Sequence, residues 1–230
     1  MITAYRLLIF IPWILLMGCT QSTQDLTDSL ALAINGHDSA QITKEQVSGI
    51  PYASQIVEFG GNPEALMVLA WAEPGRHQTP IALKWLSANS EMLVTQAGRI
   101  TKTVNFPDNN LLSIHALKPD PLARGLHLRT TPHHWSYTMS WHPGYHVGYE
   151  AESRFEVLGE VTKQLPFDVQ TLLHVKETIS IPTIDFKTSN HYWLDPQTGR
   201  VIASEQTITP NGATFKLYTG KAYQQVNDHE

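Results

Sequence analysis

The longest stretch of alternating apolar and polar side chains extends over residues 146–161. Successive side chains of a β-strand point to opposite faces of the sheet. The pattern therefore predicts a strand with one packed and one solvated face. The packed set is Tyr149, Ala151, Ser153, Phe155 and Val157, and the solvated set is Glu150, Glu152, Arg154 and Glu156. Residues 135–141 alternate in the same way, with large aromatic rings on one face.

Shorter runs of the same kind are separated by turn residues along most of the chain. Repeated short strands with turn signals between them favour a meander, in which sequence neighbours pair. The C-terminal pair is joined by Asp195–Gly199, whose Asp, Pro and Gly are typical of a type I turn with a final residue of positive φ. Further strands are predicted at residues 54–59, 64–72, 81–87, 92–95, 99–103, 172–180, 190–194, 200–208 and 213–218.

Helical patterns are few and short. Residues 25–34 carry apolar side chains at helical spacing and end at Asn-Gly. Thr43 and Gln46 form a capping-box pattern that opens a helix over 44–48. Pro121 suits the first turn of a third helix, within a segment (residues 108–129) that interrupts the strand rhythm. The fold class predicted is mainly β: a large curved antiparallel sheet, half-barrel or sandwich-like, with two or three short helices packed on it.

The N-terminal residues have the layout of a bacterial export signal. Arg6 precedes an apolar run, residues 7–17, that is shorter than the roughly 20 residues of a membrane-spanning helix. Leu16-Met17-Gly18-Cys19 is similar to a lipobox, in which Cys19 would be acylated and become the mature N-terminus. Thr20, rather than Asp, follows Cys19, which by analogy with lipoprotein sorting predicts the outer membrane. The predicted division is a signal peptide (1–18), a tether (19–24) and a single mainly-β domain (25–230).

Composition narrows the classes of partner. The formal net charge is −5 and the apolar fraction is 42%, so the chain can form a packed core and lacks the positive field that nucleic acid requires. Cys19 is the only cysteine, so no disulfide stabilises the fold. We expect no nucleic-acid partner and no cofactor.

Several motifs together resemble the YjbF/GfcB-type lipoproteins of group 4 capsule and exopolysaccharide production. They are the Tyr-Trp-x-Asp-Pro-x-x-Gly hairpin at 192–199 with the following Ser-Glu-Gln, and the segments 50–54, 71–73 and 83–87. The similarity covers about residues 26–223. It implies a lipid-anchored outer-membrane protein that faces the periplasm and assists polysaccharide secretion, with export or envelope proteins, and the polysaccharide itself, as candidate partners. It implies no catalytic residues.

Two clusters of polar residues suggest chemistry. Glu150 and Glu152 share a face and could flank a glycosidic bond, although an acidic strand face is more often only solvated. Four histidines, two of them separated by Pro143-Gly144, are better explained as a loop than as a metal site, since ligands must converge on one point. These are His133, His134, His142 and His146. We predict no metal and no catalytic residues.

Aromatic side chains are numerous, and sugar rings stack on exposed tryptophan and tyrosine. Six of them lie beside polar and turn residues and are predicted to form a binding surface for polymer or partner: Trp135, Tyr137, Trp141, Tyr145, Tyr192 and Trp193. Trp71 and Trp85 lie inside apolar runs and are predicted to be core. The function predicted is a non-enzymatic accessory lipoprotein of capsule or exopolysaccharide secretion. A glycan-modifying envelope enzyme and a carrier of lipid or another apolar ligand remain alternatives.

Overall fold

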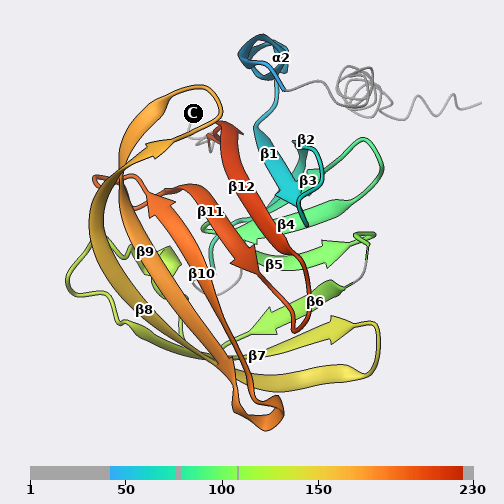
Figure 1. The fold of residues 1–230 in the computed structure, drawn as a ribbon, viewed down its shortest axis with the longest axis vertical. Coiled ribbons are helices and arrows are strands. Elements are labelled where there is room, and N and C mark those ends of the chain that lie inside the picture. The colour runs from blue at the N-terminus through green and yellow to red at the C-terminus, as the bar shows by residue number, and fades with distance from the viewer. Residues whose placement is uncertain (1–41, 76–78, 108, 225–230) are drawn as a thin grey trace, which may run out of the picture.

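The computed structural model describes residues 42–75, 79–107 and 109–224. In this part of the chain, twelve strands form one antiparallel sheet that curls into a nearly closed barrel (Figure 1). The predicted large curved antiparallel sheet is therefore confirmed, in its barrel-like form. The strands are β1 (Ser54–Phe59), β2 (Ala65–Glu73), β3 (Ala82–Leu86), β4 (Met92–Gln96), β5 (Arg99–Val104), β6 (Asn110–His115), β7 (His134–His142), β8 (His146–Gln164), β9 (Val169–Ile181), β10 (Phe186–Leu194), β11 (Val201–Thr207) and β12 (Thr214–Lys221).

The first and last strands of the chain pair with each other, whereas two strands from the middle of the chain form the unpaired edges of the barrel. The strand order is β5-β4-β3-β2-β1-β12-β11-β10-β9-β8-β7-β6, so β1 pairs with β12 while β5 and β6 are the two edges. No backbone ladder joins β5 to β6 among the described residues. Near the turn between them, the Leu111 amide donates to Thr103 Oγ1 over 3.0 Å, which holds the two edges together at that point. We call this junction the seam.

The helices are short and lie at the ends of the barrel. Helix α2 (Lys44–Gly49) has the predicted capping box, because Thr43 Oγ1 accepts from the Gln46 amide and Gln46 Oε1 accepts from the Thr43 amide. Helix α3 (Pro121–Arg124) is capped by Asp120 and buries Leu122 in the core. A 3₁₀ turn, η1, spans Pro182–Ile184. The described residues include no helix long and apolar enough to cross a membrane.

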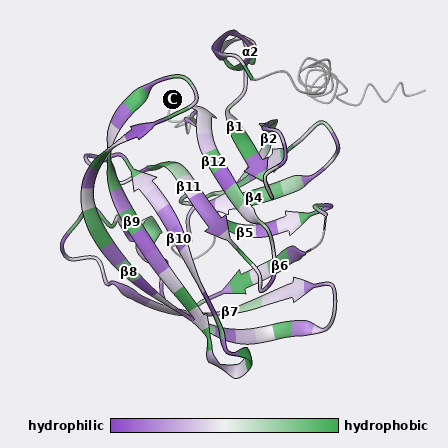
Figure 2. Ribbon diagram, viewed as in Figure 1, coloured by the Kyte–Doolittle hydropathy of each residue, from purple (hydrophilic) through white to green (hydrophobic). Residues whose placement is uncertain are grey.

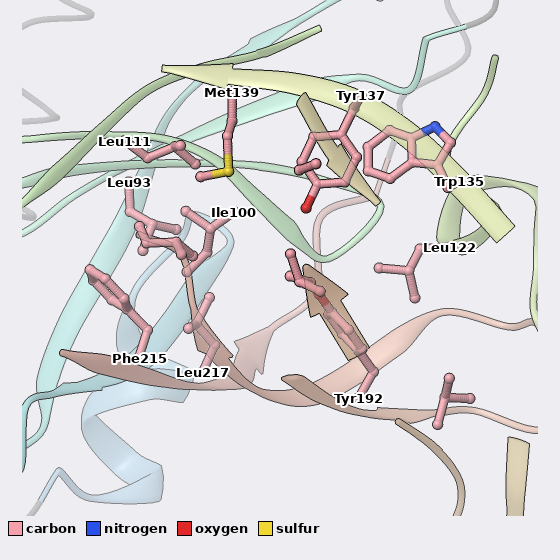
Figure 3. Close-up of a cluster of buried hydrophobic side chains, with 14 of the residues drawn as sticks. Leu93, Ile100, Leu111, Leu122, Trp135, Tyr137, Met139, Tyr192, Phe215 and Leu217 are labelled. Atoms are coloured by element: carbon pink, nitrogen blue, oxygen red, sulfur yellow. The ribbon is translucent and has the colours of Figure 1, made fainter. Parts of the chain in front are cut away.

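Side chains on the inner face of the barrel fill its interior. Hydropathy alternates along the strands (Figure 2), as the period of two predicts. Figure 3 shows Trp135, Tyr137 and Met139 of β7 pointing across the barrel toward Tyr192 and Leu217 of the opposite wall. The main core joins residues from nearly every strand, so the interior is a packed core rather than a channel.

One strand was not predicted. β6 lies in the segment 108–129, where the strand rhythm is interrupted, and pairs with β7. Its register shifts between Leu111 and Ser113, and such a bulge removes the period of two that reveals a strand. The predicted turn at Asp195–Gly199 is confirmed, with Gly199 at φ +71° and its amide donating to the Asp195 carbonyl. The predicted helix over 25–34, the signal peptide and the tether lie outside the described residues.

Candidate functional site

Five of the six aromatic residues predicted to form a binding surface are buried. Trp135, Tyr137, Trp141, Tyr192 and Trp193 are at most 7% exposed, whereas Tyr145 is fully exposed at the β7–β8 turn. The exposure assumed for these five is therefore wrong. The inner faces of β7 and β10 carry four of them into the core, because the alternation places them on the packed side. A direct role in binding stays a prediction.

Trp193 is buried on the outer face of the sheet. The end of the β8–β9 hairpin packs over it through Leu165 and Leu172. The Trp193 ring stacks on His174, with centroids 5.0 Å apart, and Lys163 Nζ lies 3.5 Å from its centroid. Burial, His191 and Lys163 together lower the pKa of His174. Trp193 therefore anchors the hairpin to the barrel wall.

Two of the buried tryptophans form part of cleft walls. Trp141 stacks on His146, with centroids 4.6 Å apart, beside a cleft of about 460 Å³ at the η1 end of the barrel. Trp135 lines a cleft of about 150 Å³ at the seam, and its Nε1 donates to the Lys118 carbonyl. The six residues thus lie in several separate places and do not form one surface.

For Trp71 the predicted burial, rather than the predicted exposure, is wrong. It was predicted to be core but is 57% exposed, whereas Trp85 is buried as predicted. The register of β2 against β3 shifts between Leu69 and Trp71. A bulge of this kind reverses the alternation that follows it, so Trp71 points outward.

The most unusual feature of the interior is a buried ion cluster. Arg99, at the start of β5, donates from Nη1 to Glu177 Oε2 over 2.9 Å and lies 2.9 Å from Glu177 Oε1 through Nη2. Its Nε donates to Asp120 Oδ2 over 2.5 Å. Arg99 is 2% exposed and Glu177 is fully buried. The guanidinium thus joins the seam, the α3 cap and β9 at one point.

Hydroxyl groups complete the hydrogen bonding of Glu177. Ser153 donates to Oε1 and Tyr192 donates to Oε2. With the two Arg99 contacts, all of the roughly four acceptor sites of the carboxylate are used. Burying an ion pair costs desolvation energy that such additional hydrogen bonds offset. Gln206 lies beside this group, where it accepts from the Ile100 amide and donates to the Gly98 carbonyl.

The charges of the cluster are fixed by its surroundings. Burial acts to lower the pKa of Arg99, but the carboxylates of Asp120 and Glu177 outweigh it, so the pKa is raised well above its ordinary value. Burial is also the main reason why the pKa values of Tyr137 and Tyr192 are raised. Arg99 is therefore charged and both tyrosines neutral throughout the physiological range.

This cluster is suited to holding the barrel together rather than to acid–base chemistry. General acid–base catalysis needs a group within hydrogen-bond reach of a substrate. Glu177 has no exposed surface, and Arg99 and Asp120, which line the seam cleft, are paired with each other. Sequence reasoning missed the cluster, although Glu177 stands in the apolar phase of β9 between Val175 and Ile179, which is a detectable signal.

The other candidates for chemistry are placed differently. Glu150 and Glu152 are exposed on the outer face of β8, opposite the packed side. His133, His134, His142 and His146 lie at the two ends of β7 and the start of β8, and no group of three potential metal ligands occurs among the described residues. The cavity found inside the sheet measures about 20 Å³, the space of a single water.

Fold and site together define a β-barrel-like domain with a packed, ion-paired interior and clefts at its seam and ends. Residues 27–219 match the family described as group 4 capsule polysaccharide lipoprotein gfcB, YjbF. The chain therefore belongs to this lipoprotein family, which confirms the resemblance carried by its motifs and implies a membrane lipid anchor.

Individual relatives agree with this assignment. The chain is 32% identical over 213 residues to the lipoprotein YjbF of Escherichia coli K12, covering 92% of this chain and 95% of that protein. It is 27% identical over 195 residues to the lipoprotein GfcB of the same organism, covering 84% and 87%. The crystal structure of the lipoprotein YmcC from Escherichia coli K12 has the same fold, with a TM-score of 0.72 and 24% identity over 87% of this chain and 97% of that one.

Proposed function

We propose that the protein is anchored through Cys19 in the outer membrane, faces the periplasm and assists capsule or exopolysaccharide secretion without catalysing a reaction itself. The observation that carries this proposal is membership of the capsule lipoprotein family across residues 27–219. The lipobox-like residues 16–19 support the anchor, and Thr20 supports sorting to the outer membrane.

The geometry favours a binding role over catalysis. The buried carboxylate of Glu177 is saturated by protein donors, and the exposed carboxylates of Glu150 and Glu152 lie on the outer side of the barrel wall. A barrel with a rigid packed interior presents its clefts and rims in fixed positions. Such preorganised surfaces suit the recognition of a polymer or of an export protein.

Deletion of the gene tests the proposal. We expect the deletion strain to lose surface polysaccharide in quantity, chain length or attachment, and complementation with the intact gene to restore it. A Glu150→Gln/Glu152→Gln variant should restore export as well as the natural sequence does, because neither carboxylate is expected to act chemically. Unchanged surface polysaccharide in the deletion strain would contradict the proposed function, and failure of the double variant at normal abundance would favour an enzyme.

A further inference from the structure

The end of the barrel beside α3 opens into a cleft of about 400 Å³. Its walls are the inner faces of β1, β3 and β4, the segment of α3 and the β10–β11 turn. Gln55 of β1 pairs with Thr219 of β12 and faces inward with it, so the cleft continues the interior of the barrel. Its volume lies within the range of about 300–1,000 Å³ that is typical of small-ligand sites. We call this cleft the basic mouth.

The charged residues that line the basic mouth are all cations. Its lining includes Arg124, Arg200 and Lys221, and the described residues contribute neither aspartate nor glutamate to it. The whole chain carries a net charge of −5, so this is a local reversal of sign. Cations gathered in a concave site concentrate the positive potential there. The basic mouth is thus electrostatically suited to an anion.

The two guanidiniums are available to a ligand. Both arginines are exposed, and neither forms an ion pair with another described residue. The neighbouring acid in the same turn is Asp195, and its Oδ1 already accepts from the amides of Gln197 and Thr198 and from the Thr198 hydroxyl. Lys221 is engaged differently, since its Nζ donates to the Ile50 carbonyl over 3.0 Å. Arg124 and Arg200 are therefore the free cations of this rim.

Two polar atoms in the same cleft have no hydrogen-bond partner among the described residues. Gln55 Oε1 and His127 Nδ1 are buried and unpaired, and both residues line the basic mouth. The His127 ring is fixed, because Gly125 and Gly199 enclose it so closely that a Cβ on either glycine would overlap it. Buried polar groups normally have hydrogen-bond partners. Of the two residues, Gln55 is half-buried on the inner wall of the cleft, where its side chain can meet a ligand.

Taken together, we infer that the basic mouth binds the carboxylated sugar residues of an acidic polysaccharide. A guanidinium recognises a carboxylate with two parallel hydrogen bonds, while sugar hydroxyls can pair with the side chain of Gln55. Leu83 and Val201 supply the apolar surface against which a sugar ring packs. This inference rests on the proposed function, which it deepens by naming the ligand class and the residues.

Titration of the full-length, detergent-solubilised lipoprotein tests the inference, with hexagalacturonate as the acidic probe and maltohexaose as the neutral one. We expect hexagalacturonate to bind and maltohexaose to bind at least tenfold more weakly. Arg124→Gln/Arg200→Gln should weaken hexagalacturonate binding at least tenfold and reduce its dependence on salt. Lys187→Gln is the matched control, because Lys187 is an exposed cation at the opposite end of β10.

Several outcomes would overturn the inference. They are absence of hexagalacturonate binding, equal binding of maltohexaose, an equal loss in the Lys187→Gln variant, or competition of the acidic probe by phosphatidylglycerol vesicles, which would identify the ligand as a lipid headgroup. An unchanged thermal midpoint establishes that the arginine variant is folded, as the exposure of both side chains predicts.

Export assays separate this inference from the proposed function. If deletion abolishes export and the arginine variant restores it fully, the proposed function stands and the basic mouth is not its polymer site. If deletion leaves export unchanged, the proposed function fails, and the titration alone decides whether the basic mouth binds acidic sugars.

Discussion

Arg99 and Glu177 lie 78 positions apart in the chain and form an ion pair with two contacts of 2.9 Å inside the barrel. β5 is one edge of the sheet, whereas β9 is an interior strand three steps along the ladder from the other edge, β6. The pair therefore bridges the interior between strands that share no backbone hydrogen bonds. The ion pair thus connects the seam directly to β9, whereas the backbone hydrogen bonds connect β5 to β9 only through the strands between them in the sheet.

Breaking this pair should destabilise the barrel. Glu177→Leu removes the acceptor of Arg99, Ser153 and Tyr192, and loss of one partner of a buried pair typically costs about 3–5 kcal/mol. Urea denaturation measures the loss. Glu152→Leu, on the outer face of β8, should change the free energy of unfolding by less than about 0.5 kcal/mol. Similar losses in the two variants would show that the ion cluster contributes little.

Alkaline pH should destabilise the fold through the buried tyrosines. The pKa values of Tyr137 and Tyr192 are raised by burial, so ionisation is easier in the unfolded chain. Their contribution to stability is fully present below the unfolded pKa of about 10 and is lost as pH rises above it. The free energy of unfolding, measured from pH 8 to 11, should fall above pH 10. Tyr137→Phe should make that fall shallower, whereas Phe at the fully exposed Tyr145 should leave it unchanged.

Gly199 should tolerate no side chain. Its φ is +71°, and an added Cβ would overlap the ring of His127. Gly199→Val is expected to lower the free energy of unfolding by at least about 1–2 kcal/mol through backbone strain alone. Gly61→Ala is the comparison, because φ is +78° there and nothing lies within 4 Å of the added Cβ. A cost at Gly199 no larger than that at Gly61 would mean that His127 moves aside freely.

The effect of replacing a tryptophan with alanine should depend on how deeply its side chain is buried. Trp193→Ala should cost about 3–5 kcal/mol and deplete the protein from membranes, because the ring is buried under the β8–β9 hairpin. Trp141→Ala should behave in the same way. Trp71→Ala should leave protein abundance nearly unchanged, since that side chain is 57% exposed. Loss of export by Trp193→Ala at normal abundance would restore the hypothesis that this residue acts in binding.

Substitution of Cys19 should show whether this residue carries the lipid anchor. Cys19 lies outside the described residues, and its role rests on the lipobox-like sequence 16–19. Cys19→Ser should abolish metabolic labelling with palmitate and release the protein from the membrane fraction. A serine variant that still sediments with membranes would place the anchor elsewhere.

The sequence was informative wherever local patterning decides the structure. The long strand β8, the capping box at Thr43 and the turn at Asp195 were predicted because each depends on residues close in the chain. The outward turn of Trp71 and the strand β6 were missed because a bulge in each case shifts the alternation. The pairing of β1 with β12 has no local signature, so the position of the seam could not be inferred.

The candidate sites were harder to predict than the fold. Aromatic residues beside polar ones look exposed, but on β7 the alternation itself assigns Trp135, Tyr137 and Trp141 to the packed side. Glu177 could have been recognised as a buried acid from its place among apolar residues of β9, but its partner could not. Arg124 and Arg200 come from segments that only the closed barrel brings to one rim.

The pairing of the first strand with the last also constrains the order in which the barrel assembles. In a chain that emerges from its N-terminus, β1 appears first and β12 last, so one edge of β1 has no strand partner until the last strand has emerged. An unpaired strand edge is a template for aggregation, and pairing across so long a separation is slow. Arg99 of β5 likewise emerges before Glu177 of β9, the acid with which it pairs. The nascent sheet is therefore most prone to aggregation before its final strand arrives.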